Sequence, residues 1–216
     1  MKELQDIDSS EFKQSVAIYE SSFPSNEKRP YQKVIKMLQN DRNYHLFISS
    51  KNDTVIGISL MYTFSSLSIG FLDYMAVIPS CQKQGIGKKL FNFTLEKLNS
   101  FVSGGIGLLM EIQRENVQDL QEAVLRKNRM KFYMSLRAKI LDGVDYLLPP
   151  LQHGLAPEEM YLILRPLKVI QYMPKQSVIR YIRAIYLTIY DYHCHDLLDK
   201  ISQNLPAKIM LHDIVI

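Results

Sequence analysis

The stretch LDYMAVIPSCQKQGIGKKLF, from Leu72 to Phe91, decides how the rest of the chain is interpreted. Its apolar residues predict a buried strand that ends at Pro79, and a short polar loop follows. Gly85 and Gly87 then open a helix. The first amides of a helix have no acceptor within it and lie at the positive end of its dipole. The stretch therefore predicts a binding site for an anion such as a phosphate.

Side chains of the same loop suit a phosphate ligand. The amides of Gln82 and Gln84 can donate hydrogen bonds, and Lys83 and Lys88 add positive charge. An ordinary tight turn into a helix would explain the glycines alone. A Walker loop needs Gly-Lys followed by Ser or Thr, and a dinucleotide fingerprint needs three glycines in an early βαβ unit. Neither pattern is present, so both of these nucleotide sites are excluded.

A match to a known family makes the assignment specific. Gln82-Lys83-Gln84-Gly85-Ile86-Gly87 matches the (Arg or Gln)-x-x-Gly-x-(Gly or Ala) signature, and the chain resembles the GNAT N-acetyltransferase superfamily. The strand LDYMAVIP resembles that family's fourth strand, and the resemblance extends from about Tyr19 to Pro166. YESSFPSNEKRP (19–30) resembles the helix and loop that help form the acceptor site. KNRMKFYMSLRAKILDGVDYLLP (127–149) resembles the segment in which a Phe-Tyr pair near a helix end precedes a strand.

The resemblance implies an acetyl-CoA-dependent enzyme that transfers an acetyl group directly to a primary amine. Coenzyme A would then be a co-substrate, with its pyrophosphate held by Gln82, Lys83, Gln84, Gly85, Ile86, Gly87 and Lys88. Its pantetheine arm would pair with the backbone of Met75, Ala76 and Val77. An amide near Val77 would polarise the thioester carbonyl. Arg126 stands where the family often has asparagine, and it is expected either to reach the cofactor or to lie in solvent.

Two residues are candidates for proton transfer. Tyr133 occupies the family's Phe-Tyr position and would protonate the departing thiolate; the alternative is a core tyrosine. Glu111 lies late in the apolar strand LLMEIQ, where an unpaired carboxylate is costly, and is the candidate base. The alternative for Glu111 is pairing with a nearby Arg or Lys. Asp73 and Glu20 are further candidates for proton transfer or for orienting the amine.

One residue departs from the family pattern near Tyr133. The glycine that commonly follows this tyrosine by four residues is Arg137 here. If the helix ends there in a left-handed turn, arginine costs roughly 1 kcal/mol more than glycine.

Periodicity predicts a mixed α/β chain with a GNAT-like central sheet flanked by helices. A GNAT-like domain is expected over residues 1–166, and a connector (167–174) and a C-terminal helical extension over 167–216. Within the extension, Tyr186 and Tyr190 continue a stripe with Ile182 and Ile189, which favours packing or a homodimer contact over a ligand site. The remaining predicted elements are helices over 9–23, 30–38, 85–102 and about 117–136, and strands over 44–49, 54–64, 67–78, 106–113, 139–148 and 160–164.

Composition limits the other possibilities. The chain has 216 residues, 47% of them hydrophobic, and a net charge of +4 without a long basic run, so nucleic-acid binding is not implied. Only Cys81 and Cys194 are present, the N-terminus lacks a signal pattern, and no stretch has the roughly 20 apolar residues needed to span a bilayer. A cytoplasmic protein without membrane contact is expected. His193 and His195 would point in opposite directions on a helix, so no metal site is expected.

Two functions from different classes remain open on the sequence alone. The first is a catalytic N-acetyltransferase acting on a small-molecule or peptide amine. The alternative is a non-catalytic GNAT-like acyl-CoA-binding or regulatory module. The loop at Gln82–Lys88 fits both, whereas Tyr133 and Glu111 favour the enzyme.

Overall fold

The computed structural model describes residues 1–24, 27–115, 117–152 and 154–214. The chain divides into two compact units, Met1–Gly105 and Ile106–Ile216. Each is described by itself below.

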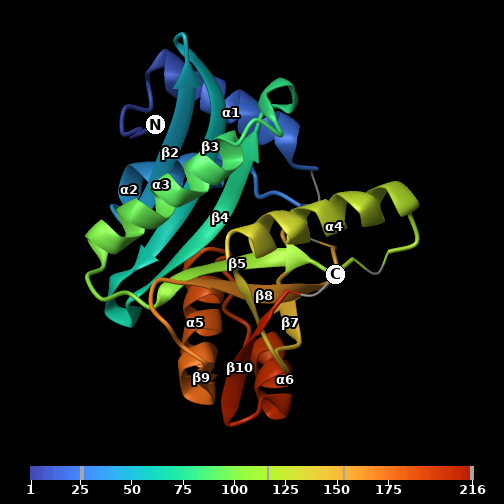
Figure 1. Ribbon diagram of the computed structural model, residues 1–216. Helices are drawn as coiled ribbons and strands as arrows, with labels where there is room; N and C mark the ends of the chain where they lie inside the picture. Colours follow the sequence, from blue (N-terminus) through green and yellow to red (C-terminus); the bar gives the residue numbers. More distant parts are fainter. Residues whose placement is uncertain (25–26, 116, 153, 215–216) are drawn as a thin grey trace. The chain divides into compact units, whose positions relative to one another are not determined.

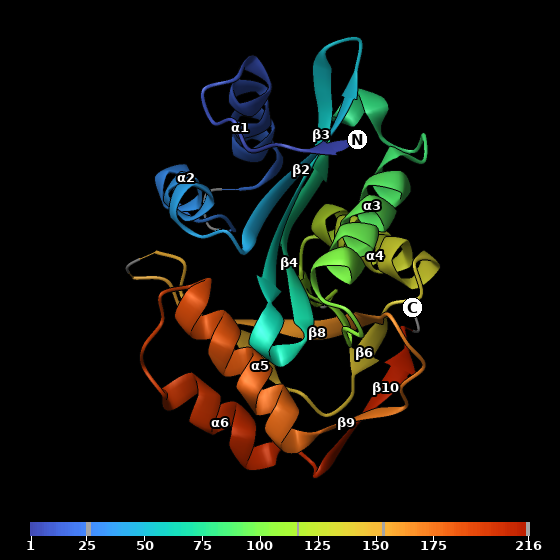
Figure 2. The ribbon, with the colours of Figure 1, turned by 90° about the vertical axis from the view of Figure 1, so that its left-hand side faces the viewer.

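The first unit is an antiparallel sheet covered on both faces. Strands pair in the order β1-β2-β3-β4, with α1 and α2 against one face and α3 against the other (Figures 1 and 2). The elements are β1 (Lys2–Glu3), α1 (Ser10–Ser22), α2 (Tyr31–Asn40), β2 (Tyr44–Lys51), β3 (Thr54–Phe64), β4 (Ile69–Val77) and α3 (Ile86–Phe101), with short 3-10 turns η1 (Ser65–Leu67) and η2 (Pro79–Cys81).

Local sequence signals explain most of these boundaries. The Ser9 hydroxyl caps α1 by accepting from the Phe12 amide at 3.2 Å. The β2–β3 turn places Asn52 and Asp53 at φ 48° and 59°, a left-handed pair that matches the twist of a hairpin. Helix α3 buries an apolar stripe, with Phe91 and Leu98 at 0% exposure.

Strand β4 has one extra residue at the point where it pairs with Leu60 and Met61 of β3. Leu60 pairs with Tyr74 and Met61 with Leu72, so Asp73 is the extra residue of a β-bulge. A bulge turns its side chains away from the regular alternation. Asp73 is therefore free to point into the unit although its neighbours on both sides are also buried.

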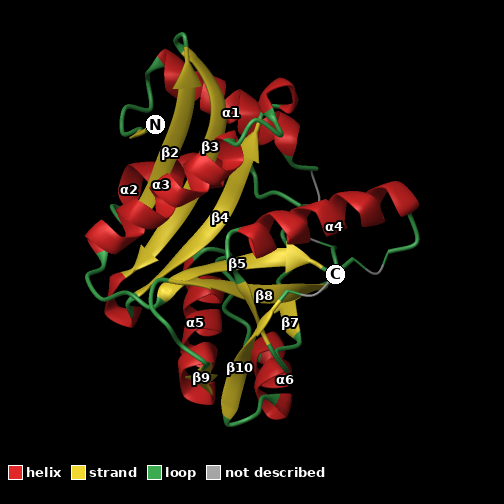
Figure 3. Cartoon of the chain, viewed as in Figure 1, coloured by secondary structure: helices red, strands yellow, loops and turns green. Residues whose placement is uncertain are grey.

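The second unit is also built on an antiparallel sheet. Its strands pair in the order β5-β8-β6-β10-β9, and β7 pairs with β8. Figure 3 draws β5, β8 and β10 of this sheet as yellow arrows. Helices α5 and α6 contact each other. The elements are β5 (Gly107–Gln113), α4 (Leu120–Ser135), β6 (Lys139–Leu141), β7 (Tyr146–Leu148), β8 (Glu158–Pro166), β9 (Tyr172–Pro174), α5 (Lys175–Thr188), α6 (Asp196–Asn204) and β10 (Lys208–Asp213).

The C-terminal extension contains the predicted helices and also strands that the sequence did not indicate. Strand β9 lies in the predicted connector, and β10 pairs with both β9 and β6. The extension thus continues the sheet of the second unit. The domain boundary at residue 166 stays a prediction.

One further sequence prediction was wrong in detail. The single strand expected over 139–148 is two strands, because the turn at Asp142 and Gly143 separates β6 from β7. Helix α4 leaves the apolar side chains of Leu120 and Val124 81% and 57% exposed. The helix instead buries Met130 and Tyr133 near its C-terminal end.

The end of α4 has the hydrogen bonds of a Schellman motif. The Ala138 amide donates to the Tyr133 carbonyl at 3.1 Å, and the Arg137 amide to the Met134 carbonyl at 2.9 Å. Arg137 occupies the left-handed position at φ 62°, where glycine is favoured. Burial and the nearby Arg137 also lower the pKa of Arg165.

We expect Arg137→Gly to raise the free energy of unfolding by about 1 kcal/mol, because glycine adopts this backbone conformation without strain. The midpoint of urea unfolding, at an unchanged slope, measures the gain. Arg137→Ala is the matched control, since it removes the charge and keeps the Cβ. Equal gains from both variants would assign the effect to charge repulsion rather than to the backbone.

No helix among the described residues is both long and apolar enough to span a lipid bilayer.

Candidate active site

The loop between β4 and α3 presents backbone amides at a helix start. Gly85 caps α3 at φ 78°, and the first amide that bonds back within the helix is that of Lys89, 3.0 Å from the Gly85 carbonyl. The amides of Ile86, Gly87 and Lys88 therefore have no acceptor one turn earlier in the helix. A Cβ at Gly85 would meet nothing within 4 Å, so glycine is favoured there by its backbone angle and not by lack of space.

The side chains of this loop have two kinds of role. The Gln82 amide donates to the Val77 carbonyl at 2.9 Å, and the Gln84 amide to the Ser80 carbonyl at 3.0 Å. Both glutamines thus hold the loop in shape, a role that the sequence did not indicate. Lys83 and Lys88 are exposed at the surface. Outward amides, a positive helix end and two lysines fit the pyrophosphate of coenzyme A.

The strand that leads into this loop is held from the β3 side. Ala76 and Val77 pair with Ile58 and Gly57. A Cβ added at Gly57 would lie 3.1 Å from the Ala76 carbonyl oxygen and 3.3 Å from a Val77 methyl, which is tighter than normal packing. Gly57 therefore permits the close approach of the two strands. Met75, Ala76 and Val77, the predicted pantetheine-binding residues, are each half-buried.

Asp73 forms a buried ion pair inside the first unit. Its carboxylate accepts from the Arg29 guanidinium and the Tyr44 hydroxyl, and the side chains of Asp73 and Arg29 are 2% and 4% exposed. Burial raises the pKa of the Asp73 carboxyl, although Arg29 and Tyr44 act in the opposite direction. These contacts give Asp73 a structural partner that the sequence did not reveal.

Arg29 is also held through its backbone, so the segment between α1 and α2 is tied to both α1 and β4. Its amide donates to the Tyr74 hydroxyl at 3.0 Å, and its carbonyl accepts from the Tyr19 hydroxyl at 2.8 Å. Glu20, another candidate, pairs with Lys28 at 2.7 Å on the surface. Ser25 and Asn26 of the predicted acceptor loop lie outside the described residues.

Glu111 lies at the centre of a cluster of tyrosines in the second unit. The Tyr146 hydroxyl donates to one carboxylate oxygen and the Tyr190 hydroxyl to the other. From the sequence, Glu111 was expected either to be an unpaired base or to pair with a nearby Arg or Lys. The tyrosine stripe was assigned to packing because nothing local shows that α5 approaches β5. One feature of the sequence could have indicated these hydroxyl donors. Tyr186 and Tyr190 lie one helical turn apart and place two hydroxyl groups on an otherwise apolar stripe.

Tyr133 is 9% exposed near the end of α4, and burial raises its pKa to about 12, with Arg129 opposing the shift. A phenol with this pKa keeps its proton at neutral pH and can donate it. The prediction that Tyr133 acts as the acid stays a prediction.

Arg126 forms contacts within the second unit that account for its charge. Its guanidinium donates to Glu122 at 2.8 Å and to the Arg114 carbonyl at 2.9 Å, and it lies 3.8 Å from Glu158. The side chain is 14% exposed. Reaching a cofactor would require breaking these contacts.

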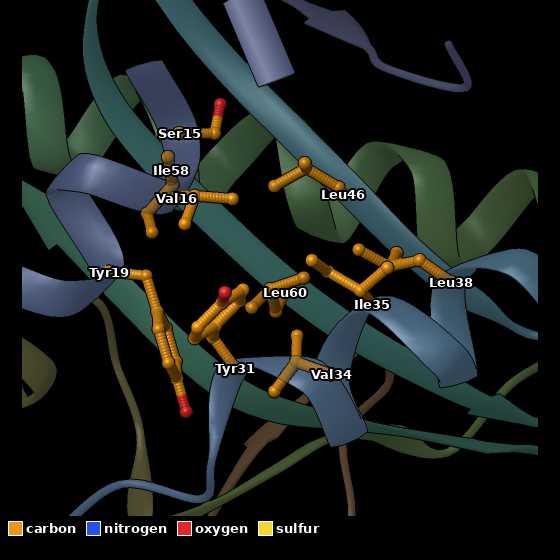
Figure 4. A pocket seen from close by; sticks show the side chains of 10 residues that line it. All are labelled: Ser15, Val16, Tyr19, Tyr31, Val34, Ile35, Leu38, Leu46, Ile58 and Leu60. Carbon is orange, nitrogen blue, oxygen red and sulfur yellow. The ribbon is translucent and has the colours of Figure 1, made fainter. Parts of the chain in front are cut away.

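The first unit contains a small apolar cavity between α1, α2 and the sheet. Figure 4 shows its lining, in which Tyr19 and Tyr31 contribute the aromatic side chains and Leu46, Ile58 and Leu60 come from the strands. Its volume of about 20 Å³ suits one water molecule at most, so it is too small for an acceptor. Among the described residues, no group of three or more His, Cys, Asp or Glu side chains could hold a metal ion.

Comparison with known proteins gives a family match. The family model described as "Acetyltransferase (GNAT) family" matches residues 12–120. A search of curated proteins found no match.

Several solved structures share the fold. A GNAT-family protein from Bacteroides thetaiotaomicron aligns with a TM-score of 0.69 and 21% identity, over 88% of this chain and 97% of that one. The ribosomal-protein-S18-alanine N-acetyltransferase of Escherichia coli aligns with a TM-score of 0.54 and 16% identity, over 78% and 94%. An aminoglycoside 6'-N-acetyltransferase complexed with coenzyme A aligns with a TM-score of 0.55 and 16% identity, over 78% of this chain and 97% of that one.

The predicted fold, a mixed sheet flanked by helices, is confirmed by these similarities. The first of them covers 88% of this chain, a larger share than residues 1–166 alone could supply, so part of the C-terminal extension is matched as well.

Proposed function

Because this chain belongs to the GNAT family of acetyltransferases, we propose that it transfers the acetyl group of acetyl-CoA directly to a primary amine. The helix start at Gly85, with outward amides after a buried strand and with two exposed lysines, is the observation that supports this proposal. It provides positive charge and unpaired donors for the pyrophosphate.

Acetyl-CoA supplies an activated acyl thioester. In the proposed reaction the amine nitrogen forms a bond to the acyl carbon, and the bond from that carbon to sulfur breaks. Glu111 takes a proton from the acceptor ammonium, which frees the lone pair of the amine nitrogen for the attack. An amide near Val77 donates to the acyl oxygen as negative charge develops on it. Tyr133 donates a proton or a hydrogen bond to the departing thiolate.

The proposal is tested by mixing the protein with acetyl-CoA and a panel of small primary amines and peptides with free amino groups. Release of free thiol together with an acetylated product establishes the transferase. Binding of acetyl-CoA without thiol release in any mixture would contradict it and favour the non-catalytic module. Cys194 is exposed and Cys81 half-buried, so a Cys81→Ser/Cys194→Ser variant removes the protein's own thiol signal.

Tyr133→Phe should lower turnover about 100-fold while leaving acetyl-CoA affinity unchanged. General acids contribute roughly 100- to 10,000-fold. The lower value is expected because burial raises the pKa of Tyr133 to about 12, which makes it a weaker acid than one matched to neutral pH. Single-turnover rates measure the effect where product release does not limit. Normal turnover in the variant would shift the acid role to water or to Tyr146.

A further inference from the structure

The first unit contains a second and larger cavity at the outer edge of strand β2. Its volume is about 330 Å³, at the lower end of the range of roughly 300–1,000 Å³ that is typical of small-molecule sites. The two residues of β1 pair with Phe47 and Ile48, and Tyr44, His45 and Leu46 at the start of β2 line the cavity next to this pairing. The space suits a small organic ligand, unlike the apolar cavity between α1, α2 and the sheet.

This edge cavity lies far from the loop proposed to hold the pyrophosphate. Phe101, which lines it, is the last residue of α3, whereas the pyrophosphate loop leads into Ile86, the first. At a rise of about 1.5 Å per residue, the helix spans roughly 22 Å between these two residues. Strand β3 also separates β2 from β4, the strand proposed to pair with pantetheine. A ligand in the edge cavity would therefore be additional to coenzyme A.

Part of the lining is apolar. The Phe101 side chain is exposed, and its ring stacks on the ring of His45 with their centroids 4.3 Å apart and their planes 16° apart. Aliphatic side chains are contributed by Leu4, Ile7 and Leu38. Together these groups can receive the apolar part of a ligand.

Glu3 lines the same cavity and has one carboxylate oxygen engaged. Its Oε1 accepts a hydrogen bond from Nδ1 of His45 at 2.7 Å. Within the described residues its Oε2 has no partner, and the side chain is half-buried. An ionised carboxylate only accepts hydrogen bonds, so Oε2 is available to an ammonium group of a ligand.

The two other charged residues of the lining differ from each other. Asp41 has both oxygens engaged: Oδ1 accepts from the amide and the side chain of Asn43 at 2.9 and 3.0 Å, and Oδ2 from the Tyr62 hydroxyl at 2.7 Å. Arg42 is exposed and forms no hydrogen bond or ion pair with any part of the chain that the structure describes. A guanidinium group with its donors available suits a carboxylate of a ligand.

Arg42 and Glu3, both described by the structure, line one cavity without forming an ion pair with each other. A ligand with a single charge would leave one of the two groups without a partner. We infer that the edge cavity binds a small zwitterion with an apolar side chain, namely a free α-amino acid of the leucine or phenylalanine type. The ligand carboxylate pairs with Arg42, its ammonium pairs with Glu3, and its side chain packs against Phe101. This site is separate from the acetyl transfer proposed above.

Calorimetric titration of the full chain without coenzyme A tests the ligand class. L-Leucine and L-phenylalanine should each bind saturably at one site. Phenylalaninamide lacks the carboxylate and phenylpropionate lacks the ammonium, so each should bind roughly 10- to 100-fold more weakly than L-phenylalanine, as for loss of a hydrogen bond to a charged group. Absence of saturable binding of both amino acids would overturn the site. Equal affinity of either analogue would overturn the zwitterionic class.

Arg42→Gln tests where the ligand binds. The side chain is exposed and makes no printed contact in the fold, so the variant should remain folded. It should lower the affinity for L-phenylalanine roughly 10- to 100-fold and leave that for phenylalaninamide unchanged. Lys36→Gln is the matched control, since Lys36 is an exposed cation of α2 outside the lining. Equal affinities in the two variants would place the ligand elsewhere and overturn the proposal.

Glu3→Gln is the complementary change at the other end of the ligand. It should weaken L-phenylalanine and leave phenylpropionate unchanged, because only the amino acid carries an ammonium group. Equal weakening of both would overturn the assigned orientation. Binding that depends on Arg42 and Glu3, in a protein that acetylates no amine, would retain this site and refute the proposed function. Acetyl transfer with binding that is unaffected by either variant would do the reverse.

Discussion

Replacing Gly87 with glutamate should abolish coenzyme A binding and leave the fold at least as stable as the parent. Gly87 is the second residue of α3, where the helix presents amides without intrahelical acceptors. A carboxylate there occupies the positive end of the helix dipole and repels the pyrophosphate. Two like unit charges about 4 Å apart near a protein surface repel each other by roughly 4 kcal/mol. The affinity for coenzyme A should therefore fall by at least about 100-fold.

The expected effect on stability has the opposite sign, which makes the result diagnostic. Glycine inside a helix is less favourable than other residues by about 1 kcal/mol, and an acidic residue in the first turn stabilises a helix. Gly87→Glu should therefore unfold at the same or a higher denaturant concentration. Calorimetric titration with coenzyme A measures the binding, and urea unfolding measures the stability.

Gly87→Ala is the matched control for this change. It gives a similar gain in helix propensity, adds no charge and conforms to the family signature, in which alanine is allowed at this position. It should bind coenzyme A as the parent does. Unchanged affinity in a folded Gly87→Glu protein, or equal losses in both variants, would show that the helix start is not an electrostatic site for the pyrophosphate.

Asp73→Asn should lower the free energy of unfolding by about 3–5 kcal/mol. The change keeps the side-chain shape but removes the negative charge of Asp73 that pairs with the Arg29 guanidinium, which is 4% exposed. Removing one partner of a buried ion pair costs this much because the remaining charge stays out of water. The loss should appear as a lower urea midpoint with an unchanged slope.

Glu20→Gln provides the comparison on the surface of the same unit. Glu20 pairs with Lys28 at 2.7 Å, but its side chain is 43% exposed, so breaking the pair should cost less than about 1 kcal/mol. Replacing both buried partners with apolar residues, as in Arg29→Met/Asp73→Leu, should recover much of the stability lost in Asp73→Asn. Equal costs for Asp73→Asn and Glu20→Gln would contradict the assignment of a buried, desolvated pair.

The sequence by itself determined the features that depend on a few neighbouring residues. The helices expected over 9–23 and 85–102 and the strands expected over 44–49 and 54–64 are present. A left-handed conformation at Arg137 was predicted for a helix that ends at this point, and Arg137 has this conformation. The glycine-bearing start of α3 pointed to the family, and the family model matches residues 12–120. Caps, turns and helical periodicity act over about one turn of chain, so they can be recognised locally.

Only the tertiary structure decided which distant side chains meet. Glu111 receives its hydroxyl donors from residues 35 and 79 positions away, and Asp73 finds Arg29 at a separation of 44. The bulge that accommodates Asp73 is a matter of register between two strands, and β10 is a strand because β6 and β9 pair with it. Strand pairing and burial depend on which surfaces come together, and local propensity does not specify them. The carboxylate nominated as a base could thus be found in the sequence, but the tyrosines that hold it could not.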